Sequence, residues 1–241
     1  MWLFSKLPVP ILAAAVLTII SPHLYAQDYA FANWAAWFNN AKFSEKWGLV
    51  NDIQFRAGKD WSNNSLLLIR PGINYYIDSK QTVAAGYATT LVTGQLAAGG
   101  RRLTEHRIWQ QYILTGRLGS AAIQHRFRLE QRFLRRPDET IFAQRFRYFV
   151  RGVIPFTRAS EDAFTRGPYG ALQNELFFNI QHNHRLNGHI FDQNRAYVAA
   201  GFRFSRRYDL EVGYMNQFLV RKDPAPNLMS HIVQLALYTR L

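Results

Sequence analysis

The sequence has no cysteine. This absence excludes disulfide bonds, thiolate metal sites and a cysteine nucleophile, and it removes any inference about compartment from redox state. Long apolar runs are also missing, because no stretch after residue 26 has the roughly 20 apolar residues that a membrane-spanning helix needs. Beyond that point the chain is therefore not expected to be a helical membrane protein.

Helical periodicity, a nucleic-acid recognition motif and a basic tail are lacking as well. The formal net charge is nevertheless +13, and the 29 Lys and Arg residues are spread through strand-like segments. This distribution favours a charged lumen or contact with anionic lipid over a DNA-binding surface. We expect membrane lipid and either anionic lipid or a small anionic solute as partners, no nucleic acid, and no cofactor.

The first 26 residues have the organisation of a secretory signal. Lys6 supplies the positive charge, residues 9–20 form the apolar region, and Ala26 can occupy the last position before cleavage. The sequence therefore predicts a Sec-type signal peptide over 1–26 and one domain over 27–241. No cysteine follows the signal, which excludes a lipoprotein anchor.

The stretch 101–151 has the clearest strand pattern. Side chains alternate across a strand, so every second residue lies on the same face. In the candidate strand 122–133 one face is mostly apolar and the other is strongly polar. The first face carries Ile123, His125, Phe127, Leu129 and Phe133, and the second carries Gln124, Arg126, Arg128, Glu130 and Arg132. A barrel in a bilayer would turn the apolar face to lipid and the charged face to its lumen.

Strand-like runs of this kind recur along the chain. They are 31–38, 47–56, 66–77, 82–92, 105–114, 122–133, 141–150, 169–181, 195–204, 209–220 and 232–241. Aromatic residues make up 15% of the chain, which suits the aromatic girdles of a membrane barrel. Bacterial single-chain barrels have even strand numbers, so we expect one run to be split or merged. The predicted fold is an all-β, antiparallel transmembrane β-barrel of 10 or 12 strands in the bacterial outer membrane.

Six short motifs resemble a known family in their order and spacing. They are EHRIWQQ at 105–111, RFRLEQRF at 126–133, QRFRY at 144–148, NELFFN at 174–179, FDQNR at 191–195 and GYMNQ at 213–217. They resemble the bacterial domain-of-unknown-function family 2490, whose members are described as outer-membrane barrels. The resemblance covers nearly all of the chain after the signal and implies a barrel in the Gram-negative envelope. It supplies no catalytic residues, because the family has no assigned activity.

Parity alone predicts which side chains line the lumen. A basic side chain on the lipid face would cost about 2 to 4 kcal/mol at the midplane, so the charged parity is expected to face inward. The candidate lumen cluster is Glu105, Arg107, Gln111, Arg126, Arg128, Glu130, Arg132, Arg145, Arg147, Arg151, Gln173, Glu175, Arg195, Glu211 and Gln217. Acids lie among these arginines, so cross-strand pairs can neutralise part of the charge. The cluster fits either a salt-bridged structural interior or a narrow channel that favours anions.

Two other classes stay open at this stage. Some outer-membrane barrels modify lipids, and the side chains to consider for such an enzyme are His106, His125, Ser160, Glu175, His182, His184 and His189. No Gly-x-Ser-x-Gly motif is present, and the sequence assigns no catalytic or metal-binding residue. A soluble ligand-binding barrel would instead need the apolar parity inside and the arginines outside.

Overall fold

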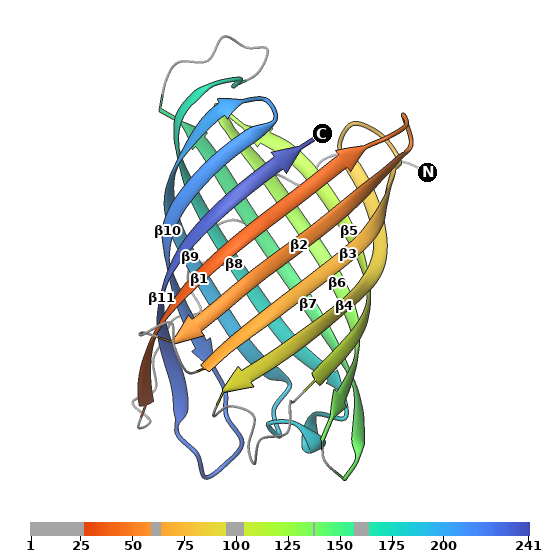
Figure 1. Ribbon diagram of the computed structural model, residues 1–241, viewed down its shortest axis with the longest axis vertical. Helices are drawn as coiled ribbons and strands as arrows, with labels where there is room; N and C mark the ends of the chain where they lie inside the picture. The colour runs from red at the N-terminus through yellow and green to blue at the C-terminus, as the bar shows by residue number, and fades with distance from the viewer. Residues whose placement is uncertain (1–26, 59–63, 95–103, 137, 157–163) are drawn as a thin grey trace.

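The computed structural model describes residues 27–58, 64–94, 104–136, 138–156 and 164–241, which form eleven β-strands closed into a barrel (Figure 1). The strands are β1 (Gln27–Lys42), β2 (Trp47–Gly58), β3 (Asn64–Tyr76), β4 (Gln81–Gly94), β5 (Thr104–Leu118), β6 (Ala121–Arg135), β7 (Thr140–Pro155), β8 (Gly167–Gln181), β9 (Phe191–Ser205), β10 (Tyr208–Leu219) and β11 (Asn227–Arg240). A short 3₁₀ helix, η2 (Asn183–Arg185), lies between β8 and β9. Among the described residues no helix is long and apolar enough to cross a membrane. The predicted signal peptide at 1–26 lies outside the described residues.

The all-β barrel is confirmed, but the expectation of 10 or 12 strands is wrong. Each run seen in the sequence overlaps one of the eleven strands. Neighbouring strands pair antiparallel around the barrel, whereas β1 and β11 pair parallel, from Gln27 opposite Asn227 to Asn40 opposite Arg240. In Figure 1 these two strands lie side by side and point the same way. An even number is required only when the closing pair is antiparallel, so a parallel closing pair permits an odd number.

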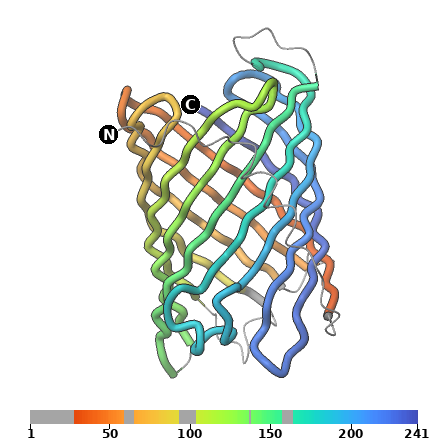
Figure 2. The backbone as a smooth tube through the Cα atoms, turned by 180° about the vertical axis from the view of Figure 1, so that it is seen from behind, coloured from red at the N-terminus to blue at the C-terminus, as the bar shows by residue number. Residues whose placement is uncertain are grey.

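The two ends of the barrel differ in their connections. The turn end, uppermost in Figure 1, has the short connections 43–46, 77–80, 119–120 and 206–207 and also the longer connection between β7 and β8. The opposite end, which we call the loop end, carries 182–190 with η2 and 220–226. Figure 2 shows from behind that the green-to-blue strands run as one continuous tilted wall between the two ends. Residues at the start of β1 and β9 therefore lie near the loop end.

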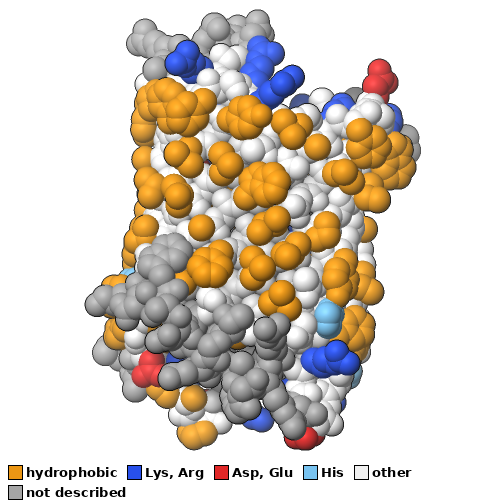
Figure 3. Space-filling model, viewed as in Figure 1, with side chains coloured by type: hydrophobic (Ala, Val, Ile, Leu, Met, Phe, Trp, Pro, Cys, Tyr) orange, Lys and Arg blue, Asp and Glu red, His pale blue; other side chains and the backbone are white. Residues whose placement is uncertain are grey.

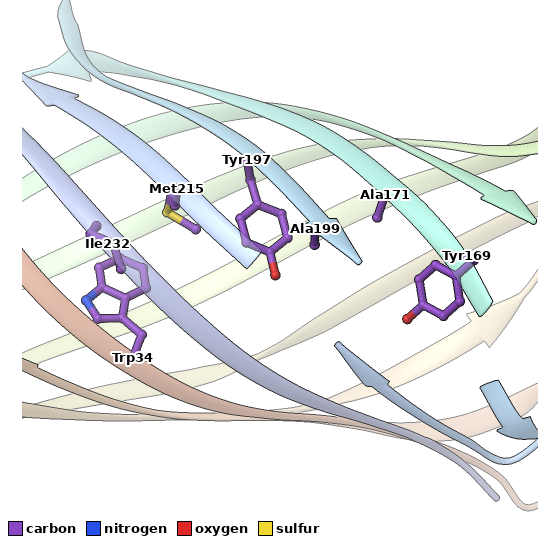
Figure 4. Close-up of a cluster of buried hydrophobic side chains, with 7 residues drawn as sticks. All are labelled: Trp34, Tyr169, Ala171, Tyr197, Ala199, Met215 and Ile232. Carbon is purple, nitrogen blue, oxygen red and sulfur yellow. The ribbon is translucent and has the colours of Figure 1, made fainter. Parts of the chain in front are cut away.

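Part of the interior is apolar. Side chains of β1, β8, β9, β10 and β11 form one buried cluster, which consists of Trp34, Tyr169, Ala171, Tyr197, Ala199, Met215 and Ile232 (Figure 4). Small alanines alternate with large rings in this cluster, as expected for a narrow barrel filled by side chains. This side of the wall combines apolar packing with ion pairs, because Glu211 and Asp209 of β10 bind Arg151 and Arg203.

A second packed point lies where β3, β4 and β5 meet. The pairing of β3 with β4 skips residues 70 and 71, where Pro71 has no N–H to donate. A Cβ on Gly72 would collide with the Trp109 ring, and a Cβ on Gly86 would lie 2.5 Å from Trp109 Cζ2. Only glycine lets the indole approach the wall so closely. Trp109 is consequently almost fully buried inside the barrel.

Candidate functional site

The centre of the interior is a network of arginines and carboxylates on β6, β7 and β8. Glu130 Oε2 accepts from Arg145 Nη2 (2.7 Å), and Glu130 Oε1 accepts from Arg147 Nη1 (2.6 Å). Glu175 Oε1 accepts from Arg147 Nη2 (2.7 Å) and from Arg126 Nη2 (2.8 Å). Glu130 is fully buried and Arg147 is 3% exposed. The two carboxylates thus join three neighbouring strands through charge-assisted hydrogen bonds.

Two further carboxylates hold arginines of the candidate cluster. Glu105 binds Arg107 through two parallel hydrogen bonds of 2.9 and 2.8 Å, and it also accepts from Arg132 Nε (2.5 Å). Glu211 accepts from both terminal nitrogens of Arg151, at 3.3 and 2.5 Å. Because the first carboxylate belongs to β5 and the second to β10, ion pairs connect the wall at several points around the barrel.

The carboxylate of Glu211 also has neutral partners. Tyr197 Oη donates to Glu211 Oε1 at 3.0 Å, and Tyr238 Oη donates to the same atom at 3.3 Å. Gln173 Oε1 accepts from Arg151 Nη1 at 3.3 Å. The carboxylate of Glu211 thus accepts hydrogen bonds from Arg151, Tyr197 and Tyr238, which offsets part of the cost of its burial.

Three arginines have a different kind of partner. Arg56 donates from Nε (3.0 Å) and Nη2 (2.5 Å) to Gln54 Oε1, and Arg128 donates from the same two nitrogens to Gln111 Oε1 (3.0 and 2.6 Å). The Gln193 amide, turned so that its oxygen faces Arg195, accepts in the same way at 2.5 and 2.9 Å.

Each of these guanidinium groups also lies over a tryptophan ring. The Arg56 Cζ is 4.1 Å and the Arg195 Cζ 5.0 Å from the Trp34 ring centroid, and the Arg128 Cζ is 4.9 Å from that of Trp109. Within the described part of the chain none of the three has a carboxylate at salt-bridge distance. We call Arg56, Arg128 and Arg195 the glutamine-held arginines.

Comparison with known proteins decides the family. The family described as "Protein of unknown function (DUF2490)" matches residues 31–227, which is most of the chain. The chain belongs to this family. The resemblance seen in the six sequence motifs is therefore confirmed at the level of the family. Comparison with curated proteins and with solved structures returned no match.

In this DUF2490 chain the candidate lumen residues fall into four groups. Glu130, Arg145, Arg147, Glu175 and Arg126 form the central network; Glu105, Arg107 and Arg132 form a second group; Arg151, Gln173 and Glu211 form a third; Gln111, Arg128, Arg195 and Gln217 complete the set. In the last group Gln111 holds Arg128, whereas Arg195 and Gln217 are opposite each other in the β9–β10 register without a hydrogen bond between their side chains.

Several inward charges of this DUF2490 chain escaped the sequence analysis. Asp52 and Arg70 form an ion pair of 2.6 Å inside β2 and β3, and Arg56 is on the same parity as Asp52. The sequence allows this face to be predicted, since residues 52, 54 and 56 alternate with apolar residues. The inward position of Asp192, which binds Arg145 Nη1 at 3.2 Å, could not be predicted from alternation. A bulge in the β8–β9 pairing next to Asp192 shifts the alternation there.

The histidines do not converge on an enzyme site in the described residues. His106 contacts Tyr87 Oη, and His125 Nδ1 lies 2.9 Å from Tyr148 Oη; both pairs are on the outer surface, whereas Glu175 is inside. Ser160 lies outside the described residues.

Of the three loop histidines, His182 and His184 pack edge to face with ring centroids 6.0 Å apart, whereas His189 has a different partner. His182 Nδ1 contacts the Phe142 carbonyl at 2.9 Å, and His189 Nε2 faces Asp223 at 3.7 Å. The described part of the chain contains no group of three His, Asp or Glu side chains that could hold a metal ion.

Proposed function

We propose that this DUF2490 chain is an integral outer-membrane β-barrel whose arginine-rich interior forms a narrow path that favours anions. The observation that carries the proposal is the division of its side chains between the two faces of the wall. Outward Ile108, Leu172 and Val233 are 48%, 56% and 53% exposed, while the central carboxylate Glu130 is fully buried. Figure 3 shows hydrophobic side chains spread over the outer face of the strands.

An apolar surface of this extent fits lipid better than water. Soluble monomers rarely expose contiguous apolar patches above a few hundred Å². Every strand has 12 to 16 residues, more than the roughly 9 to 11 that a tilted strand needs to cross a bilayer. The closed ladder leaves no unpaired edge, which a hydrocarbon environment requires. The sequence prediction of a secretory signal supports export to the envelope.

Aromatic side chains at both ends suit the two membrane interfaces. At the turn end Trp47 and Tyr75 are exposed and pack edge to face, with ring centroids 4.9 Å apart. At the loop end exposed Phe31 stacks on His231 at 5.3 Å. Amphipathic rings at these two levels support a barrel held at fixed depth between two headgroup layers.

The preference for anions follows from the balance of inward charge. The inward arginines are Arg56, Arg70, Arg107, Arg126, Arg128, Arg132, Arg145, Arg147, Arg151, Arg195 and Arg203, and the inward acids are Asp52, Glu105, Glu130, Glu175, Asp192, Asp209 and Glu211. Arginine is in excess, and a low-dielectric wall strengthens the resulting positive potential.

A purely structural role is the second candidate. Arg151 on β7 binds Glu211 on β10, three strands away, so side chains cross the interior at this level. A barrel of this size can be filled by its own side chains.

Conductance separates the two candidates. We would fold the full chain in detergent micelles and insert it into a planar bilayer. Discrete current steps that favour chloride over potassium support the anion path. A protein that inserts and shows heat-modifiable mobility but stays silent supports the structural role. A chain that stays monomeric and dispersed in buffer without detergent contradicts the membrane proposal and favours the soluble ligand-binding barrel.

A further inference from the structure

We infer that Arg56 and Arg195, placed against Trp34, form a binding site for an oxoanion, either a carboxylate or a phosphate, inside the barrel. The inference deepens the proposed anion path and rests on it in one respect, since a solute must reach the interior. Its starting point is that these two arginines, like Arg128, are held by glutamines, whereas the other inward arginines are held by carboxylates.

Glutamine fixes a guanidinium group without neutralising it. The Nε and Nη2 atoms of Arg56 bind Gln54, and the same two atoms of Arg195 bind Gln193. In both arginines Nη1 has no hydrogen-bond acceptor among the described residues. A guanidinium has five N–H donors in a fixed fork, so each side chain keeps donors for an external acceptor.

The nearest acids are already occupied. Glu175 lies opposite Arg195 in the β8–β9 register, but its carboxylate binds Arg126 and Arg147. Asp52 lies on the same face of β2 as Arg56, but it binds Arg70 at 2.6 Å. Among the described residues neither Arg56 nor Arg195 therefore has a carboxylate of its own at salt-bridge distance.

One aromatic ring contacts both guanidinium groups and limits their motion. A guanidinium from β2 and one from β9 lie against the same Trp34 ring, at 4.1 and 5.0 Å. The Arg195 Cζ also lies 4.9 Å from the Phe177 ring centroid. Cation–π contacts offset part of the repulsion between the two arginines, and rigid placement lowers the entropy cost of binding a ligand.

Accessibility separates this pair from the third glutamine-held arginine. Arg128 is 4% exposed and its Nη1 is buried without a partner, whereas Arg56 and Arg195 are both partly exposed. Arg56 is two residues before the end of β2 and Arg195 is near the start of β9, so the site lies toward the loop end. An oxoanion entering there would meet two positioned guanidinium groups, whose fork matches a planar carboxylate or a phosphate better than a spherical chloride ion.

The test is a direct titration of the full chain, folded in micelles at constant ionic strength, with inorganic phosphate, with succinate and with chloride. We expect saturable binding of phosphate or succinate, and the two arms tell the phosphate class from the carboxylate class. Arg56→Gln and Arg195→Gln should each weaken binding about tenfold or more, since a hydrogen bond to a charged group contributes roughly 1.5 to 3 kcal/mol. The matched control is Arg107→Gln, which also removes one inward charge but leaves Glu105 bound to Arg132.

Three outcomes would overturn the inference: no saturable oxoanion binding to the wild type, wild-type affinity in both glutamine variants, or an equal loss in Arg107→Gln, which would mean that only net charge matters. If a glutamine variant does not fold, Arg56→Lys and Arg195→Lys keep the charge and remove the fork, and should still weaken binding. Failure of the channel proposal looks different. A barrel that binds phosphate but conducts no current supports the oxoanion site and contradicts the anion path. A barrel that conducts but binds no oxoanion supports the anion path and contradicts the site.

Discussion

Two sets of arginines inside one barrel show what a partner does to a buried charge. On β6 and β7 Arg145 and Arg147 share the carboxylate of Glu130. On β2 and β9 Arg56 and Arg195 are held by glutamine oxygens and a tryptophan ring. The carboxylate neutralises the guanidinium charge and cross-links two strands, whereas the glutamine only positions the guanidinium group. The first arrangement stabilises the wall, and the second leaves charge available to a ligand.

The largest effect is expected where a glutamine is put in place of the central carboxylate. Glu130→Gln keeps the size of the side chain but leaves Arg145 and Arg147 without its charge in a fully buried place. Breaking a buried pair costs about 3 to 5 kcal/mol, and because Arg147 keeps Glu175 and Arg145 keeps Asp192 we expect the lower end of this range. The midpoint of urea unfolding in micelles, followed by tryptophan fluorescence, should therefore fall by an amount that corresponds to about 3 kcal/mol.

The control for this change is Glu139→Gln. Glu139 pairs with Arg136 at 3.9 Å and contacts Arg185, and all three side chains are well exposed, so the midpoint should hardly move. If Glu130→Gln were as stable as the wild type, glutamine would serve as well as a carboxylate, and the distinction between the two sets of arginines would have no energetic basis.

The contact between a glutamine-held arginine and its tryptophan ring can be disturbed by a substitution on the other side of the ring. Gly86→Ala would place a Cβ 2.2 Å from the backbone oxygen of Pro71 and 2.5 Å from Trp109 Cζ2, and the ring of Trp109 contacts the guanidinium of Arg128. Overpacking of this kind costs about 1 to 3 kcal/mol. The same urea titration measures it, with Gly116→Ala as the control because a Cβ there would meet no atom within 4 Å. Equal midpoints for both variants would mean that the indole has room to move.

A smaller, opposite effect is expected when a glutamine becomes a carboxylate. Gln111→Glu gives buried Arg128 an ion pair in the geometry it already has, with donors at 3.0 and 2.6 Å. Charge-assisted hydrogen bonds are about twice as strong as neutral ones, so we expect a gain of about 1 kcal/mol. Gln181→Glu, at the exposed end of β8, is the control and should change little. A gain in stability would mean that the protein is less stable with glutamine at position 111 than with glutamate, and that the glutamine is kept for another reason. A loss would contradict the interpretation that Gln111 holds Arg128 without neutralising it.

Alternation along single strands predicts which residues of β6 share a face. One parity of this strand carries Arg126, Arg128 and Glu130, and this parity lies inside the barrel. The pattern could not show which residues meet across strands, since the contact of Glu175 with Arg126 spans from β8 to β6 and depends on register and curvature. It also failed at Asp192, where a bulge breaks the period of two. The strand number failed because a rule for antiparallel closure was applied to a barrel that closes parallel.

The smallest effect concerns an exposed carboxylate, the counterpart of buried Glu130. In the connection 77–80 Asp78 Oδ1 accepts from the backbone N–H of Lys80 and of Gln81, both at 2.7 Å. The N–H of Lys80 is the largest cause that holds the pKa of Asp78 below its ordinary value. Because the folded pKa is the lower one, the stabilisation is complete above the unfolded value, about 3.9, and is lost as the pH falls through the folded value.

Asp78→Asn keeps an acceptor oxygen and does not titrate. The variant should therefore be less stable than the wild type at pH 6, and the two stabilities should approach each other at pH 3. Unfolding midpoints at the two pH values check this. The control is Glu45→Gln in the neighbouring connection 43–46, because the carboxylate of Glu45 accepts no hydrogen bond from the described residues and this change should show no such convergence. A difference for Asp78→Asn that stays constant with pH would mean that the turn needs the shape of the side chain and gains nothing from its charge. An exposed carboxylate would then act as a positioner, as Gln54 and Gln111 do inside the barrel.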